Sequence, residues 1–262
     1  VDLTTLTGSG PGGAVIAADI SRPRAAPPPQ PAVGPPGRGR ADRQATMRRA
    51  IGDLMARSKR EIPHYYLATT VDLAAATTWL TEQNAHRPVT ERLLPAALLL
   101  KASALAARDV PTLNGFWDDG HRAAPAVHLG VAVSLRGGGL IAPAIHDADH
   151  LSLDELMASL RDLVERARAG RLRSSEMADP TITVTNLGDQ GAEEVFGVIY
   201  PPQVAMVGFG RIVDRPWAHN GMLGVHPTVR ATLAADHRAS EGHEGSRFLT
   251  TIDRLLQAPE AL

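Results

Sequence analysis

The segment that most constrains the fold lies near the C-terminus, where an apolar stretch runs directly into a charged corner. Residues 225–235 are mostly apolar or β-branched and predict a strand. The heptapeptide Asp236-His237-Arg238-Ala239-Ser240-Glu241-Gly242 follows, and residues 240–256 have the spacing of an amphipathic helix. A histidine at a strand-to-helix corner can hold one pose and still face a cavity, and histidine titrates near working pH. His237 is therefore our candidate general base, although most histidines only cap a strand or a helix end.

The rest of the chain divides by composition into three parts. Residues 1–21 are short, polar and small, and residues 22–42 include seven prolines without apolar periodicity, which predicts an extended linker. From residue 43 to 262 the pattern is that of a folded domain. Helices are predicted at 47–60, 94–107 and 152–169, the last with a Ser152–Glu155 capping box. Strands are predicted at 65–73, 127–135, 140–145, 181–187 and 203–213. Without strict βαβ alternation, an α/β fold with a mixed, largely antiparallel sheet is favoured.

Composition excludes several classes of function. The net charge of −1 argues against a nucleic-acid footprint. The absence of cysteine excludes disulfides, thiolate–zinc sites and a cysteine nucleophile, and is compatible with a reducing cytoplasm. No apolar run reaches the ~18 residues of a membrane span. We therefore expect a cytoplasmic protein with no nucleic-acid or membrane partner.

Two further side chains are candidates for chemistry. Thr185 lies in Thr183-Val184-Thr185-Asn186-Leu187-Gly188, at the end of a predicted strand. A hydroxyl there can donate to a developing oxyanion, and the alternative is a β-branched strand with an Asn-Leu-Gly turn. Glu241 lies in the first turn of the last helix, where the helix dipole favours a carboxylate.

Three other patterns are rejected as functional motifs. His146-Asp147-Ala148-Asp149-His150 has no further ligand at recognisable spacing, so we expect a solvated loop and no metal site. Residues 8–13 match G-x-G-x-x-G, but no strand precedes them, which argues against dinucleotide binding. No G-x-S-x-G elbow occurs, so a hydrolase triad of that type is unsupported.

An ordered series of motifs resembles the acyltransferase (E2) cores of 2-oxo acid dehydrogenase complexes. Residues 236–242 resemble the Asp-His-Arg-x-x-Asp-Gly signature, with Glu241 in place of Asp, and residues 183–188 resemble Thr-Ile-Ser-Asn-Leu-Gly, with Thr185 in place of Ser. The other motifs of the series are Ile62-Pro-His-Tyr-Tyr-Leu, Pro111-Thr-Leu-Asn, Gly139-Leu-Ile-Ala-Pro and Tyr200-Pro-Pro-Gln-Val-Ala. Residues 1–21 resemble the second half of the family's peripheral subunit-binding domain.

The resemblance implies a fold, an assembly and a substrate. The fold is the chloramphenicol-acetyltransferase-like two-layer sandwich, in homotrimers whose active sites lie between subunits. His237 of one subunit would face Thr185 of its neighbour, and the acid at Glu241 would hold an arginine. A coenzyme A thioester would be the co-substrate, with Asn186 near it and Arg48 or Arg49 meeting its phosphates. The alternative for these arginines is a basic solvated helix face.

Three hypotheses remain for the acceptor of the acyl group. A lipoyl carrier domain needs a lysine at a hairpin tip, and the only lysines, Lys59 and Lys101, lie in predicted helices, so no lipoyl group is expected on this chain. Together with the half-size subunit-binding segment, the short tail and Glu241, this favours a stand-alone enzyme that acylates a small-molecule hydroxyl, as in tetronate acetylation in natural-product biosynthesis. The alternative is the dihydrolipoyl acyltransferase core of a dehydrogenase complex, with the complex's subunits as partners. A non-catalytic scaffold is the third hypothesis, and the retained His237 argues against it.

Overall fold

The computed structural model describes residues 40–135 and 139–262. The predicted subunit-binding remnant at 1–21 and almost all of the linker at 22–42 lie outside the described residues, so the division into three parts stays a prediction. The helices are α2 (Arg40–Glu61), α3 (Ala74–Ala85), α4 (Pro95–Asp109), α5 (Leu153–Arg168), α6 (Ser174–Ala178) and α7 (Gly242–Gln257). The strands are β1 (His64–Asp72), β2 (Gly115–Trp117), β3 (His121–Ala123), β4 (Leu129–Val131), β5 (Val133–Ser134), β6 (Leu140–Ile141), β7 (Ala144–Ile145), β8 (Ile182–Asn186), β9 (Ala205–Phe209), β10 (Val213–His219) and β11 (Met222–Asp236).

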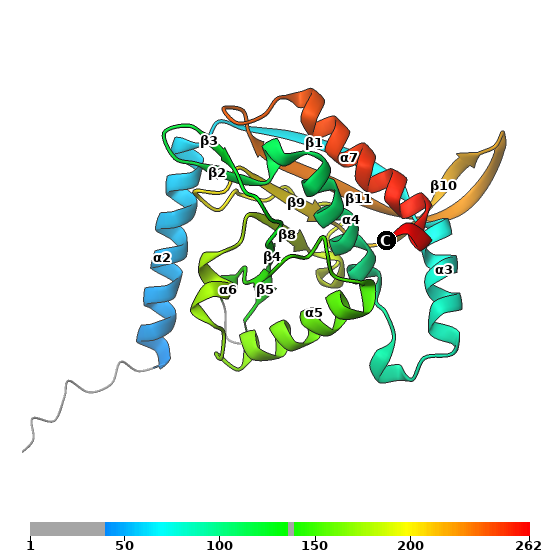
Figure 1. The fold of residues 1–262 in the computed structure, drawn as a ribbon, viewed down its shortest axis with the longest axis horizontal. Coiled ribbons are helices and arrows are strands. Elements are labelled where there is room, and N and C mark those ends of the chain that lie inside the picture. The colour runs from blue at the N-terminus through cyan, green and yellow to red at the C-terminus, as the bar shows by residue number, and fades with distance from the viewer. Residues whose placement is uncertain (1–39, 136–138) are drawn as a thin grey trace, which may run out of the picture. The chain divides into compact units, whose positions relative to one another are not determined.

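One mixed sheet organises the domain. Its strand order is β1-β11-β9-β8-β4-β7, and β10 pairs with the outer half of β11 as a hairpin (Figure 1). Strand β8 is parallel to β4 and β9, while the other neighbours in this sheet run antiparallel. This confirms the predicted α/β class with a mixed, largely antiparallel sheet.

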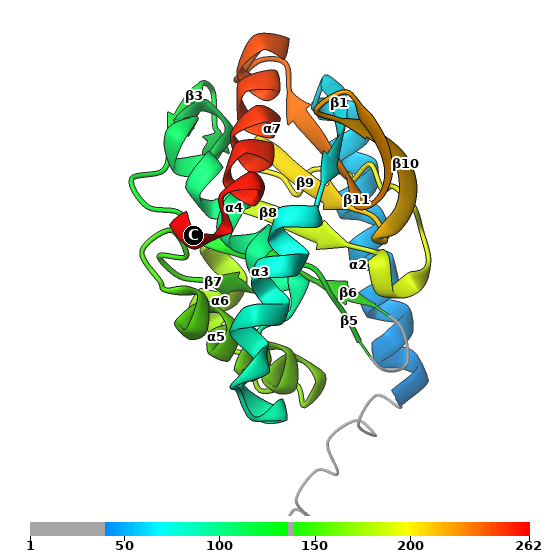
Figure 2. The ribbon, with the colours of Figure 1, turned by 90° about the vertical axis from the view of Figure 1, so that its right-hand side faces the viewer.

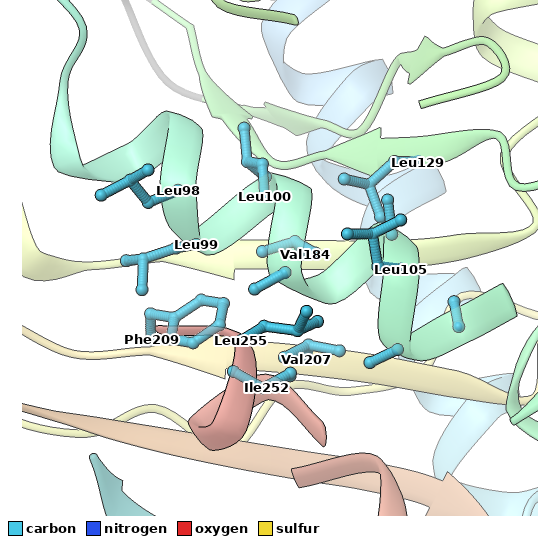
Figure 3. Packing of buried hydrophobic residues seen from close by; sticks show 14 of the residues in the cluster. Leu98, Leu99, Leu100, Leu105, Leu129, Val184, Val207, Phe209, Ile252 and Leu255 are labelled. Atoms are coloured by element: carbon cyan, nitrogen blue, oxygen red, sulfur yellow. The ribbon is translucent and has the colours of Figure 1, made fainter. Parts of the chain in front are cut away.

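Helices α3, α4 and α7 cover one face of the sheet (Figure 2). Side chains alternate between the two faces of a strand. In β9 and β11 the odd-numbered residues point into the core, and in β8 the even-numbered residues do. Figure 3 shows leucines of α4 packed on Val184, Val207 and Phe209, with Ile252 of α7 beside them. Phe209 and Ile252 are completely buried. This two-layer core positions the C-terminal ends of β8 and β11, where Thr185 and His237 lie.

The opposite face of the sheet carries a chain segment instead of a helix layer. The hydroxyl of Thr232 on β11 donates to the carbonyl of Val195. Two glycines of this face allow the close approach: a Cβ at Gly208 would lie 2.2 Å from the Val195 carbonyl oxygen, and one at Gly210 would lie 1.9 Å from that of Glu193. Residues 193–195 therefore lie directly on the backbone of β9 and the residue after it.

Several predicted elements differ from the observed ones. The capping box is present, since the Glu155 amide donates to Ser152 Oγ over 3.3 Å and the Ser152 amide donates to Glu155. The strand predicted at 127–135 is divided into β4 and β5, and the one at 140–145 into β6 and β7. Helix α3 was not predicted, because its sequence is rich in alanine and threonine and buries only Ala76 and Leu80.

Candidate functional site

The corner after β11 is a tightly hydrogen-bonded turn. The His237 amide donates to the carbonyl of Pro63 over 3.0 Å, which joins the corner to the start of β1. The amides of Ala239 and Ser240 both donate to the carbonyl of Asp236, and the Arg238 amide donates to the Asp236 carboxylate. Every amide from 237 to 240 thus has a partner, which fixes the backbone that carries the histidine.

An ion pair between a buried aspartate and an exposed arginine lies at this corner. Asp236 is completely buried, and its carboxylate accepts bonds from Nε and Nη2 of Arg238, the second at 2.7 Å. The carboxylate raises the pKa of Arg238, so the guanidinium stays charged. Its Cζ also lies 4.6 Å from the ring centroid of Trp117, on the β2–β3 hairpin. The aspartate and arginine of the motif therefore shape the corner and leave the histidine between them free.

The imidazole of His237 is exposed in the protomer. Within the described ranges its ring nitrogens form no hydrogen bond. Its one recorded ring neighbour is Tyr65 of β1, at 5.0 Å between centroids and an interplanar angle of 60°. The base candidate is thus available to a substrate or to another subunit.

Thr185 lies far from this histidine in the same protomer. Its side chain is 8% exposed, on the face of β8 opposite the helices. Thr185 is in register with Gly208, which is in register with Thr232, and His237 comes five residues after Thr232. Five strand residues span about 17 Å, whereas direct proton transfer needs contact within about 3.2 Å. One protomer therefore does not bring the two predicted groups together.

One pocket adjoins the corner, and a second pocket shares Pro201, Pro202 and Gln203 with it. The first, of 380 Å³, is lined by polar groups that include Arg238 and by Trp117. The second, of 350 Å³, is mainly apolar and lies between the α2 side chains Met47, Ala50, Ile51 and Leu54 and the loop of Pro202. Gln203, through Oε1, accepts a bond from the hydroxyl of Thr183 over 2.7 Å, so the shared wall lies on the same face of β8 as Thr185.

The remaining predicted site residues are placed as follows. Arg48 and Arg49 are exposed on α2, the helix that lines the apolar pocket. Asn186 accepts a bond from the Gly188 amide through Oδ1, which forms the expected turn. Glu241 is 73% exposed, 3.7 Å from the ring of His243, and in the described part of the chain it pairs with no arginine.

Sequence reasoning missed two aromatic neighbours of the corner, Tyr65 and Trp117. The motif Ile62-Pro-His-Tyr-Tyr-Leu contained a signal, because Tyr65 comes two residues after Pro63, whose carbonyl accepts a bond from the His237 amide. Nothing in the local sequence placed Trp117 against Arg238, since the contact joins segments 121 residues apart and depends on the tertiary fold.

The His146–His150 segment forms a turn in which Ala148 and Asp149 are buried, so it is not the fully solvated loop that was expected. His146 Nε2 bonds Asp179 over 3.0 Å, and its ring lies 4.8 Å from that of His128. In residues 40–135 and 139–262 there is no cluster of three or more side chains suited to holding a metal ion. Across the same residues no helix combines the length and apolar character needed to cross a membrane.

Comparison with known proteins agrees with the family resemblance of the sequence motifs. Residues 39–262 match the family described as 2-oxoacid dehydrogenases acyltransferase (catalytic domain). The chain is 32% identical to the dihydrolipoyllysine-residue acetyltransferase component of the pyruvate dehydrogenase complex of Zymomonas mobilis, over 99% of this chain and 62% of that protein. It is 31% identical to the lipoamide acyltransferase component of the branched-chain alpha-keto acid dehydrogenase complex of Pseudomonas aeruginosa, over 100% of this chain and 64% of that one. The chain thus spans less than two thirds of these relatives.

Solved structures agree on the architecture. The cubic core of the pyruvate dehydrogenase multienzyme complex superposes with a TM-score of 0.77 at 25% identity, over 82% of this chain and 90% of the other. A chloramphenicol acetyltransferase superposes with a TM-score of 0.51 at 13% identity, over 78% and 94%, which speaks for the fold alone. The predicted chloramphenicol-acetyltransferase-like fold is confirmed.

The predicted small-molecule acceptor is wrong. Relatives that match the whole chain are named as components of dehydrogenase complexes acting on dihydrolipoyllysine or lipoamide, and none of these comparisons points to natural-product biosynthesis. The prediction of a stand-alone enzyme with a small-molecule partner relied on segments not found in the chain. A chain that spans 62% of a relative carries no information on the remainder, so those absences cannot decide the acceptor.

Proposed function

This chain belongs to the 2-oxoacid dehydrogenases acyltransferase (catalytic domain) family, and from that membership we propose that it transfers an acyl group between coenzyme A and a dihydrolipoyl thiol within a dehydrogenase complex. The observation that carries the proposal is His237, presented with an exposed ring by a corner whose backbone amides are all bonded. The family is one of acyltransferases. The lipoyl acceptor and the complex come from the names of the relatives and are therefore proposals for this chain.

The chemistry needs one base and one oxyanion donor. His237 takes the proton from the attacking thiol, and the thiolate attacks the thioester carbonyl. The hydroxyl of Thr185 donates to the tetrahedral oxyanion, and one such donor contributes about 3–4 kcal/mol to lowering the barrier. Collapse of the intermediate breaks the bond to the departing thiolate, which takes back the proton from the imidazolium. The two thiols have exchanged the acyl group, and the imidazole is neutral again.

We propose further that the site is shared between subunits of a trimer. The separation of about 17 Å along the strands keeps His237 from the Thr185 of its own protomer. A threonine of a neighbouring subunit supplies the missing donor, and the exposed imidazole is free to meet it. Superposition on the cubic core of a multienzyme complex supports a symmetric assembly of this domain.

Coenzyme A binding is assigned to the side of the domain where α2 lies. The apolar pocket beside Met47 and Ile51 suits the uncharged arm of the thioester, and Arg48 and Arg49 stand on the same helix for the phosphates. Asn186 lies next to Thr185 and is proposed to contact the thioester through its amide nitrogen, because its Oδ1 already accepts the bond from Gly188. Glu241 is kept as a charge at the start of α7 whose pairing depends on the assembly.

A direct assay tests the proposed function. The protein is incubated with acetyl-CoA and dihydrolipoamide, and S-acetyldihydrolipoamide is quantified by mass spectrometry. We expect rapid transfer by the wild type and a loss of about 10²–10⁴-fold in His237→Ala, because a general base contributes a factor of that size. Absence of transfer by the folded wild type, or wild-type rates in His237→Ala, would show that the proposal is wrong.

A further inference from the structure

Among residues 40–135 and 139–262 the imidazole of His237 finds no hydrogen-bond partner that would hold its ring. The bond from the His237 amide to Pro63 fixes the backbone but leaves rotation about the side-chain bonds free. Within the described ranges the only ring beside it is Tyr65. The orientation of the base therefore depends on how firmly that phenol is held.

The hydroxyl of Tyr65 is fixed from two sides. Its oxygen lies 2.9 Å from Ser240 Oγ and 3.0 Å from the carbonyl oxygen of Glu241. A phenol has one proton, so Tyr65 donates to the Glu241 carbonyl and accepts from the Ser240 hydroxyl. Burial raises the pKa of Tyr65, so the phenol keeps its proton at working pH and remains a donor.

The surrounding residues are shaped for this tyrosine. Ser240 is only 4% exposed, so its hydroxyl is directed inward at the phenol. Gly245 lies one turn into α7 and leaves room for the phenol. A Cβ at this position would lie 3.0 Å from the Tyr65 oxygen and 2.8 Å from Leu67. Strand β1 and helix α7 contact each other next to the end of β11 (Figure 1). The phenol thus joins strand β1 to the residues at the start of helix α7.

We propose that Tyr65, held by Ser240, is a positioning residue that orients the imidazole of His237 for proton transfer. The role rests on the proposed function, since it needs His237 to be the base. Tyr65 acts through the face of its ring, and Ser240 acts through the Tyr65 hydroxyl. Neither residue takes part in bond making.

The expected effect is on turnover and not on coenzyme A binding. A tilted aromatic pair shifts the population of one ring pose by roughly 2- to 12-fold. We expect kcat of Tyr65→Leu to fall by about that factor with KM for acetyl-CoA unchanged. Tyr65→Phe keeps the ring and should lose less. Ser240→Ala should lose no more than Tyr65→Phe, because it removes one of the two bonds that Tyr65→Phe removes, and the double variant should be no worse than Tyr65→Phe alone.

A matched control separates positioning from simple destabilisation. Trp79 of α3 is a half-buried aromatic residue packed on the main core, away from the corner. Trp79→Leu should lower the melting temperature yet leave kcat of the folded enzyme unchanged. If Tyr65→Leu behaves in the same way, with reduced stability and wild-type kcat, Tyr65 is structural only and the inference is overturned.

A second readout does not require the acceptor to be correct. In the intact protein labelled with ¹³C in its histidine rings, the Tyr65 ring should shift the His237 resonance, which is assigned by its loss in His237→Ala. The shift should persist in Tyr65→Phe and disappear in Tyr65→Leu. An unchanged His237 resonance in Tyr65→Leu overturns the inference even if dihydrolipoamide is the acceptor. A wild type that fails to acylate dihydrolipoamide overturns the proposed function, and the resonance then still decides the contact.

Discussion

Complementation between two inactive variants tests whether the site is shared between subunits. His237→Ala removes the base, and Thr185→Val removes the hydroxyl while keeping the shape of a side chain that is 8% exposed. The two positions are five strand residues out of register, or about 17 Å, so one protomer cannot supply both to one substrate. Each variant alone should therefore be inactive, and a mixed trimer should recover sites that have both wild-type groups.

The size of the recovery follows from the geometry. In a trimer whose sites each pair the histidine of one subunit with the threonine of the next, any mixed trimer contains one complete site. Random assembly of equal amounts makes about three quarters of the trimers mixed, so about one quarter of all sites are complete. Thr185→Val alone should be slower by about 10²–10³-fold, and His237→Ala by about 10²–10⁴-fold. Recovery to about a quarter of wild-type activity in the unfractionated mixture, or to about a third in isolated mixed trimers, would be far above either background.

The assay uses co-expression, so that the two variants assemble together as they fold. The two variants carry different affinity tags, sequential purification isolates mixed trimers, and transfer from acetyl-CoA to dihydrolipoamide is measured. Co-expression of His237→Ala with the double variant His237→Ala/Thr185→Val is the control, and it should stay inactive because no wild-type histidine is present. Mixed trimers that are no more active than the single variants would refute the shared site.

Two further predictions concern stability. Gly210→Ala should destabilise the fold by about 1–3 kcal/mol, because its Cβ would lie 1.9 Å from the Glu193 carbonyl oxygen. Gly52→Ala, in open space on α2, should stabilise the fold by about 0.5–1 kcal/mol. Thermal unfolding measures both variants, and equal melting temperatures would contradict this account. The bidentate bond from Arg166 lowers the pKa of Glu176 to about 2, so this pair stabilises the fold fully above pH 4.5, and the contribution is lost as the pH falls from there towards 2. Urea titrations at pH 6 and pH 3 should show that the stability advantage of the wild type over Glu176→Gln shrinks at the lower pH, and a constant difference would exclude this origin.

Local sequence patterns predicted the elements that have a strong local signal. Helix α5 combines a capping box at Ser152 with an apolar stripe, and both its ends were close to the prediction. Helix α3 has no capping box and no apolar stripe, and Ala76 and Leu80 pack it on the core. Where tertiary packing supplies the stability, as in α3, the local pattern contains little of the information.

The candidate site shows the same division. The heptapeptide around His237 predicted the base, and the corner that the structure shows is the strand-to-helix turn expected for it. The choice of acceptor was wrong, because it depended on missing segments and on the change to Glu241. That side chain is 73% exposed, so its one extra methylene meets no constraint within the protomer. An exposed position is a poor guide to which substrate a site accepts.

The order of apolar and polar residues along the chain was enough to determine the α/β class, the strand before His237 and the helix after it, because these follow from periodicities of a few residues. The pairing of β1 with β11, the phenol of Tyr65 beside the imidazole and the Arg238 guanidinium over Trp117 were decided only by tertiary structure. Each of these contacts joins segments more than one hundred residues apart. No local pattern encodes such a contact, since it depends on how distant strands pair and pack in the folded domain.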